Sequence, residues 1–173
     1  MALIEIEKTF LLIKAPEWVN EVSGRLIIDT YFPESADHHP KLRVRQDGDK
    51  YELTKKSLID PSDASQQYET TVELSEAEFN CLVQASSRKL VKTRYSRNIG
   101  DISEDVDVFH GPLEGLILVD LEFACQESIG RSSFPEYCLV DVTQEDFIAG
   151  GMLAGKSLQD ISQDLSRLGC SIE

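Results

Sequence analysis

Short segments in which charged and apolar residues alternate, with each charged face carrying a single sign, constrain this chain more than any other feature. The first is residues 3–10, LIEIEKTF. Successive side chains of a β-strand point to opposite faces, so Glu5, Glu7 and Thr9 are expected in one row and the apolar side chains in the other. The segment therefore predicts a strand with two neighbouring carboxylates on one face.

The same alternation recurs four times further along the chain. The segments are KLRVR at 41–45, VKTR at 91–94, DVDV at 105–108 and VDLEF at 119–123. Carboxylates are ligands for hard divalent cations, and arginine and lysine bind phosphates. Paired carboxylates on three strands and paired cations on two predict a surface that holds a metal ion and a polyanion together.

Many short strands joined by turns, with few helices between them, favour an antiparallel sheet or barrel and an α+β fold class. We expect strands near 3–12, 24–32, 41–46, 50–56, 67–74, 88–97, 103–109, 115–123 and 137–141. Capping residues predict helices near 16–22, after Ser75, after Thr143, and from Ser157 to Gly169. The segment 57–67 is rich in Ser, Asp and Gln and is expected to be a mobile loop.

Two arrangements explain the alternation. In a one-sided sheet the apolar face covers a core and the charges face water. In a closed barrel with a polar interior the charges face inward, and helices cover the apolar exterior. The sorting by sign favours the barrel, because like charges two residues apart repel unless a ligand lies between them. Lys56 and Glu69 are then expected to face inward. Lys8, Lys55 and Val72 are expected to face outward.

The composition fits one domain, spanning 1–173, and limits its partners. The 17 Lys and Arg residues against 31 Asp and Glu give a net charge of −14, which argues against nucleic acids and anionic membranes as partners. No apolar run approaches the roughly 20 residues that span a bilayer, and the N-terminus lacks a secretory pattern. We expect a cytoplasmic protein whose four widely spaced cysteines are reduced.

Two other motifs are interpreted as chance or as surface features. Residues 150–157, GGMLAGKS, match the phosphate-binding loop pattern G-x-x-x-x-G-K-[ST]. Such a loop joins a strand to a helix in a parallel sheet, and the 16 residues after Ser157 are too few to complete one. His38 and His39 lack spaced metal-ligand partners and are expected in a surface loop.

Taken in order, the charged motifs resemble the CYTH superfamily, also called triphosphate tunnel metalloenzymes. The resemblance begins with that superfamily's E-x-E-x-K strand, here 5–9, and covers nearly the whole chain. It continues through 42–45, 53–56, 92–94, 105–107, 120–122, 142–143 and 153–156. It implies a closed eight-stranded antiparallel β-barrel, a tunnel with a charged interior and flanking helices. The implied activities are inorganic triphosphatase, thiamine triphosphatase, RNA triphosphatase and class IV adenylyl cyclase.

The resemblance also implies roles for individual residues. The metal-binding carboxylates would be Glu5, Glu7, Asp107, Asp120 and Glu122. The phosphates of the substrate would be bound by Arg43, Arg45, Lys56, Lys92, Arg94 and Lys156. Glu7 or Glu69 would orient the attacking water. The implied cofactor is Mg²⁺, with Mn²⁺ as the other choice, and the implied partner is a small-molecule triphosphate or nucleotide.

One departure from the superfamily pattern bears on function. Its hallmark lysine falls at position 9, where this chain has Thr9, which can hydrogen-bond a phosphate but carries no charge. We expect metal-dependent hydrolysis of a triphosphate. Inorganic triphosphate is preferred, because no base-recognition set accompanies the phosphate-binding residues. Two alternatives stay open: a class IV-type cyclase that makes cyclic AMP and pyrophosphate from ATP, and a non-catalytic module that binds polyphosphate or nucleotide.

Overall fold

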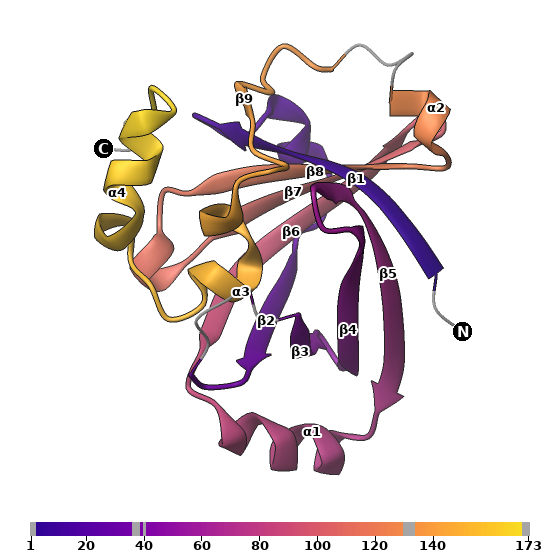
Figure 1. Cartoon of the computed structure of the whole chain (residues 1–173), viewed down its shortest axis with the longest axis vertical. Coiled ribbons are helices and arrows are strands. Elements are labelled where there is room, and N and C mark those ends of the chain that lie inside the picture. Colours follow the sequence, from indigo (N-terminus) through magenta and orange to yellow (C-terminus); the bar gives the residue numbers. More distant parts are fainter. Residues whose placement is uncertain (1–2, 36–38, 40, 130–133, 171–173) are drawn as a thin grey trace.

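The computed structural model describes residues 3–35, 39, 41–129 and 134–170. The strands are β1 (Leu3–Leu12), β2 (Arg25–Phe32), β3 (Leu42–Asp47), β4 (Lys50–Asp60), β5 (Asp63–Leu74), β6 (Lys89–Ile99), β7 (Ile102–Phe109), β8 (Ile117–Phe123) and β9 (Val140–Asp141). The first eight follow the order β5-β4-β3-β2-β6-β7-β8-β1, and the pairing of β1 with β5 closes them into an antiparallel barrel (Figure 1). The expected closed eight-stranded barrel is confirmed. β9 pairs with the C-terminal half of β1.

The expectation of a mobile loop over 57–67 is wrong. β4 continues to Asp60 and β5 begins at Asp63, so most of this segment belongs to a long hairpin. Carboxylates at the tip order the turn, because Asp60 accepts hydrogen bonds from Ser62 and Asp63 accepts them from Ser65. Polar composition suggested disorder, but the pairing of β5 with both β4 and β1 supplies the backbone hydrogen bonds that hold the segment in a sheet.

The helical segments are short. They are η1 (Glu17–Glu21), α1 (Glu76–Leu82), η2 (Val83–Ala85), η3 (Gly111–Leu113), α2 (Gln126–Ile129), η4 (Asp146–Ile148), α3 (Gly150–Leu153) and α4 (Leu158–Arg167). The helices expected after Ser75 and from Ser157 are present as α1 and α4, and each begins with a capping box. The helix expected after Thr143 starts later than expected, as the short segments η4 at Asp146 and α3 at Gly150, and Thr143 does not cap it. The Thr143 hydroxyl donates to Asp141 and accepts the Thr9 amide N–H, which ties this segment to β1 instead of capping a helix.

One end of the barrel interior is apolar and closed by the C-terminal helices. The cavity-lining side chains of Leu90, Phe109 and Leu118 join a buried cluster that continues into η4, α3 and α4. Figure 1 shows α3 and α4 together on one side of the barrel, away from β5. Gly150 permits this contact, because a Cβ atom there would collide with the hydroxyl of Tyr31. Because this apolar cluster fills one end of the interior, the charged part is the part that stays accessible to a ligand.

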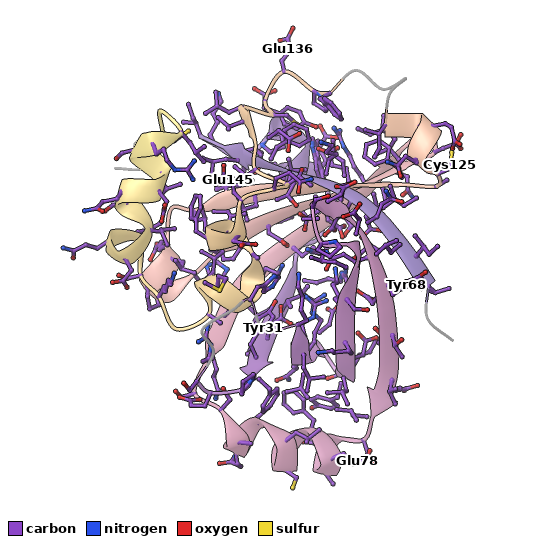
Figure 2. The ribbon with its side chains drawn as sticks, in the orientation of Figure 1. Tyr31, Tyr68, Glu78, Cys125, Glu136 and Glu145 are labelled. Carbon is purple, nitrogen blue, oxygen red and sulfur yellow. The ribbon has the colours of Figure 1, made fainter. Side chains whose placement is uncertain are left out.

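In the part of the chain that the structure describes, helical segments cover only part of the exterior, which corrects the expectation that helices cover it. Trp18 and Val19 of η1 pack with outward-facing residues of β1, β7 and β8 in a second buried cluster. The outer face of β1 and β5 is open, with Ile4 58% and Val72 53% exposed. Figure 2 shows Tyr68 projecting from the outer side of β5. The expected outward direction of Val72 is confirmed.

The residues at 150–157 do not form a phosphate-binding loop of a parallel sheet. They form the four-residue α3 and the turn that leads to the N-cap of α4, and every strand pairing in the described chain is antiparallel. The interpretation of the motif as chance is confirmed. The four cysteines are free thiols, as expected. Among the described helices, none has the length and apolar character needed to cross a membrane.

Candidate active site

The barrel encloses a cavity of about 480 Å³ to which all eight of its strands contribute. Strand alternation explains this, since the charged row of each strand points inward while its apolar row points outward. Most of the site residues expected from the sequence line this cavity: Glu5, Glu7, Arg43, Arg45, Lys56, Glu69, Lys92, Arg94, Asp107, Asp120 and Glu122. Lys156 is not among the lining residues, and its charge lies near Asp160 at the start of α4.

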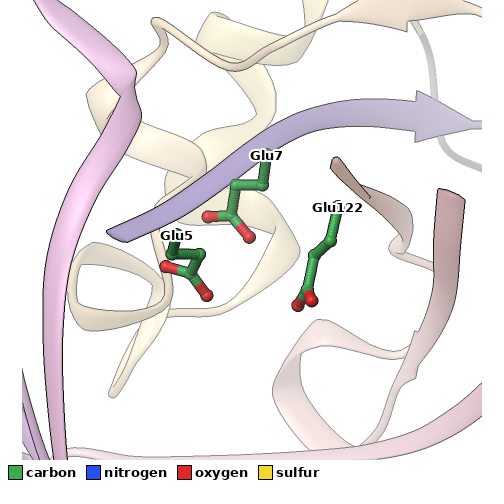
Figure 3. Close-up of side chains that lie close together, drawn as sticks. All are labelled: Glu5, Glu7 and Glu122. Atoms are coloured by element: carbon green, nitrogen blue, oxygen red, sulfur yellow. The ribbon is translucent and has the colours of Figure 1, made fainter. Parts of the chain in front are cut away.

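Three carboxylates converge at one place on the cavity wall. Glu7 of β1 is paired directly with Glu122 of β8, and Glu5 lies two residues before Glu7 on the same face. One oxygen from each of the three lies within 4.8 Å of the others (Figure 3). All three are partly buried. Such a group of oxygen ligands has the donor chemistry that Mg²⁺ prefers.

Burial and neighbouring negative charge disfavour ionisation in this cluster. Burial raises the pKa of Glu7 to about 8, and the charges of Asp120, Glu5 and Glu122 act in the same direction against the opposing effect of Lys56. The pKa of Glu122 is also raised, chiefly by burial and by Glu5. A cation bound between these carboxylates would favour their ionised forms.

Lys56 lies beside the carboxylate cluster. Its ammonium group forms an ion pair with Glu5 and lies 3.4 Å from a Glu69 oxygen and 3.8 Å from a Glu7 oxygen. Burial alone would lower the pKa of Lys56, but the surrounding carboxylates, led by Glu7, raise it. The predicted inward direction of Lys56 and Glu69 is confirmed by these contacts.

The other two expected metal carboxylates face cations. Asp107 accepts hydrogen bonds from Lys92 and from Arg94, whose Nη2 lies 2.6 Å away. Asp120 accepts one from Arg94 at 3.0 Å and one from the Thr9 hydroxyl at 2.8 Å. Burial alone would raise the pKa of Asp107, but Arg94 and Lys92 hold it well below its usual range. Asp107 thus faces two cations, whereas Asp120 bonds Arg94 and Thr9 while its charge still acts on Glu7.

Arg45 and Arg43 have different surroundings although they lie on one strand. Arg45 forms a two-pronged ion pair with the fully buried Asp29, at 2.7 and 2.8 Å. Arg43 has one long contact, 3.5 Å, to the hydroxyl of Tyr31, and its buried Nε has no partner among the described residues. Burial would lower the pKa of Arg43, but Asp29 and Tyr31 raise it. Arg43 is therefore charged and available to a ligand.

Sequence reasoning missed four residues of this site: Asp29, Tyr31, His39 and Lys41. Asp29 and Tyr31 lie on β2, whose sequence, RLIIDTYF, shows no alternation of charge. His39 lies outside any helix or strand, as expected of a loop, but it is partly buried and lines the cavity; His38 lies outside the described residues. Burial and the nearby lysines lower the pKa of His39 to about 3, so it is neutral. Lys41 alternates with apolar residues in the same segment as Arg43 and Arg45. The signal that identified those two arginines could therefore have identified Lys41 as well.

The two residues at the middle of β1 point in opposite directions. Thr9 faces the cavity and hydrogen-bonds Asp120. The Lys8 side chain lies on the other face, where its ammonium group is 2.8 Å from Asp141. The expected outward direction of Lys8 is confirmed, and β1 contributes no cation to the cavity.

Comparison with known proteins finds matches at the level of structure. No protein-family model matches the chain, and no curated protein sequence matches it. The crystal structure of the inorganic triphosphatase NE1496 is 29% identical, with a TM-score of 0.62, and the match covers 87% of this chain and 93% of that one. A crystal structure of NE1496 described as a hypothetical protein gives the same identity and TM-score, with 97% of that chain covered.

More distant structures share the fold. A putative adenylate cyclase from Bacillus halodurans is 16% identical, with a TM-score of 0.55 and coverage of 92% of this chain and 97% of that one. A conserved hypothetical protein from Pyrococcus furiosus is 19% identical, with a TM-score of 0.53 and coverage of 96% and 91%. With the ordered charged motifs and the closed eight-stranded tunnel, the likeness to NE1496 confirms the resemblance to the CYTH superfamily.

Proposed function

We propose that this protein is a metal-dependent triphosphatase that acts on inorganic triphosphate. The observation that carries the proposal is one cavity whose lining holds both the oxygen-ligand cluster of Glu5, Glu7 and Glu122 and a set of arginines and lysines. The likeness to the inorganic triphosphatase NE1496 supports it. A free polyphosphate suits a cavity of about 480 Å³ whose apolar end is filled by the protein's own helices.

The carboxylate cluster fits a hard divalent cation. Its three ligands are all carboxylate oxygens from two adjacent strands, and it opens into the substrate cavity, so waters and phosphate oxygens can complete the coordination. Mg²⁺ held there would neutralise phosphate charge and position the substrate. We assign Glu5, Glu7 and Glu122 to this site. Asp107 and Asp120 orient the cations Lys92 and Arg94 instead.

The cations would bind and orient the polyphosphate. Arg43 offers unpaired N–H groups, while Arg45 is held in a fixed direction by Asp29. Arginine binds phosphate through two parallel hydrogen bonds, which fixes orientation as well as charge. Holding the chain in this way would align the terminal phosphorus, the attacking water and the leaving pyrophosphate in line.

Glu69 is the better candidate for orienting the attacking water. The pKa of Glu69 is lowered: burial acts to raise it, but Lys56 and Arg43 outweigh that effect. It is therefore ionised at neutral pH and can accept a hydrogen bond from water, which then attacks phosphorus as the bond to pyrophosphate breaks. Glu7 was the other residue expected in this role, and its place in the carboxylate cluster supports a role as a metal ligand instead.

The test is product analysis with inorganic triphosphate and ATP as parallel substrates, each with Mg²⁺ and with EDTA. The proposal expects phosphate and pyrophosphate from triphosphate with Mg²⁺ and no products with EDTA. Cyclic AMP and pyrophosphate from ATP would make the protein a cyclase. Binding of triphosphate without any product would make it a binding module.

A further inference from the structure

The cations of the cavity differ in whether a carboxylate already neutralises them. Four have carboxylate partners among the described residues: Arg45 with Asp29, Lys92 with Asp107, Arg94 with three aspartates, and Lys56 with three glutamates. Arg43 and Lys41 have none within ion-pair distance in the part of the chain that the structure describes. These two are therefore the cations with the most capacity left for an anion.

Lys41 and Arg43 lie on the same side of one strand. Lys41 immediately precedes β3, and its carbonyl accepts the backbone N–H of Lys56 at 2.9 Å, which extends the ladder between β3 and β4 by one residue. Residues two apart on a strand lie about 7 Å apart on the same face. Both side chains line the cavity. A chain of linked phosphates running along β3 would meet Arg43 first and Lys41 next.

The Lys41 ammonium group is held in the cavity by one weak contact. Its Nζ lies 3.4 Å from the amide oxygen of Gln67, and the side chain is half-buried. Burial and the charge of Lys56 lower the pKa of Lys41, which shows that its charge is incompletely compensated. An ammonium group has three N–H donors, so at least two remain for a ligand. His39, beside it, is neutral and does not compete as a cation.

We propose that Lys41 binds one phosphate of the substrate, the one that lies furthest from Arg45. Lys41 thereby supplies a positive charge to the cavity that β1 does not provide. The inference depends on the proposed function in one respect only, the identification of the bound anion as triphosphate. β1 presents Thr9 to the cavity and Lys8 to Asp141 outside it, so Lys41 and Arg43 together form a phosphate-binding pair on β3.

The test compares Lys41→Met and Lys41→Arg with Lys55→Met. Lys55 is the matched control, because it lies on the neighbouring strand, is exposed and points away from the cavity. Dissociation constants for inorganic triphosphate are measured by calorimetry with EDTA present, together with kcat and KM for triphosphate with Mg²⁺. Thermal melting of each variant reports whether the fold is intact.

Lys41→Met is expected to weaken triphosphate binding and raise KM by roughly 10- to 100-fold, the effect of removing one hydrogen-bonded charge. Lys41→Arg should stay within about threefold of the natural protein, and Lys55→Met should be unchanged. Equal affinity in Lys41→Met and Lys55→Met would overturn the inference. If the natural protein binds triphosphate without hydrolysing it, the proposed function fails, while the binding measurements still decide the role of Lys41. Should Lys41→Met not fold, Lys41→Gln takes its place.

Discussion

The Thr9 hydroxyl donates a hydrogen bond of 2.8 Å to Asp120 across the β1–β8 pair, while the next side chain, Lys8, forms its ion pair outside the barrel. Thr9 thus takes an inward position at which a lysine would add a charge to the cavity. Its hydrogen bond keeps Asp120 directed toward Arg94, whose Nη2 is 3.0 Å away. The residue at position 9 therefore influences how much cationic charge the substrate meets.

Thr9→Lys is expected to lower KM for triphosphate by about three- to tenfold, because one more charged donor faces the phosphates. The kcat value should change less than KM. Steady-state kinetics with Mg²⁺ measures both, and Thr9→Val is the control that removes the hydroxyl without adding charge. An unchanged KM in Thr9→Lys would show that position 9 does not reach the substrate.

The carboxylate cluster makes the metal-free protein sensitive to pH. The folded-state pKa of Glu7 is about 8 and its ordinary value is 4.5, so the folded state holds a proton that the unfolded chain has lost. Stability of the metal-free protein is therefore expected to fall as pH rises from about 4.5 to 8. Glu7→Gln should remove that dependence and stabilise the metal-free fold at pH 8 by roughly 1–3 kcal/mol.

Urea unfolding in EDTA at pH 5.5 and pH 8 measures this effect. The two proteins should be closest in stability at pH 5.5, and Glu7→Gln should be the more stable at pH 8. A natural protein as stable as Glu7→Gln at pH 8 would contradict the assigned protonation of Glu7.

Metal binding is expected to compete with the same proton. Because the metal needs ionised Glu7, its affinity should increase as pH rises from about 6.5 toward 8, and binding should release a proton. Calorimetric titration with Mg²⁺ in two buffers of different ionisation enthalpy counts the released protons. A pH-independent affinity with no proton release would exclude Glu7 as a ligand.

The buried pair of Asp29 and Arg45 is expected to contribute to stability as well as to orientation. Asp29→Asn would leave Arg45 with a buried uncompensated charge, at a cost of about 3–5 kcal/mol in unfolding free energy. The matched control is Asp47→Asn, which breaks the more exposed ion pair with Arg25 and should cost less than about 1 kcal/mol. Urea denaturation compares them, and equal effects would contradict the account.

The same pair has a defined dependence on acid. Burial would raise the pKa of Asp29, but Arg45 and Arg43 lower it well below its ordinary value of 3.8. The stability that this carboxylate contributes is therefore present at neutral pH and is lost as pH falls below about 4. Asp29→Asn should remove that part of the acid sensitivity.

Strand alternation made the barrel and most of its lining predictable. The direction of Lys8, Lys56 and Glu69 followed from the period of two, and the ordered motifs located the charged strands. Alternation assigns a face and gives no distance, so it could not separate Glu122, in the carboxylate cluster, from Asp107, which faces Lys92 and Arg94.

Other features depended on contacts between distant segments. The hairpin tip at 60–63 is ordered partly by Gln144, which bonds Ala64 and Asp63 from 80 residues away. The composition of the segment 57–67 gives no indication of a contact with Gln144. Asp29 could not be identified from the sequence, because it is a single acidic residue in a largely apolar strand. Its ion-pair partner, Arg45, lies on the neighbouring strand.

The central claim is that the three-carboxylate cluster holds the metal that hydrolysis of inorganic triphosphate requires. The most direct measurement is the initial rate of phosphate release from triphosphate, with Mg²⁺ and with EDTA, in the natural protein and in Glu122→Gln. We predict a rate that depends on Mg²⁺ and falls at least about 100-fold in Glu122→Gln, as for loss of a group that acts on the transition state. A rate that survives EDTA, or a fully active Glu122→Gln, would contradict the account.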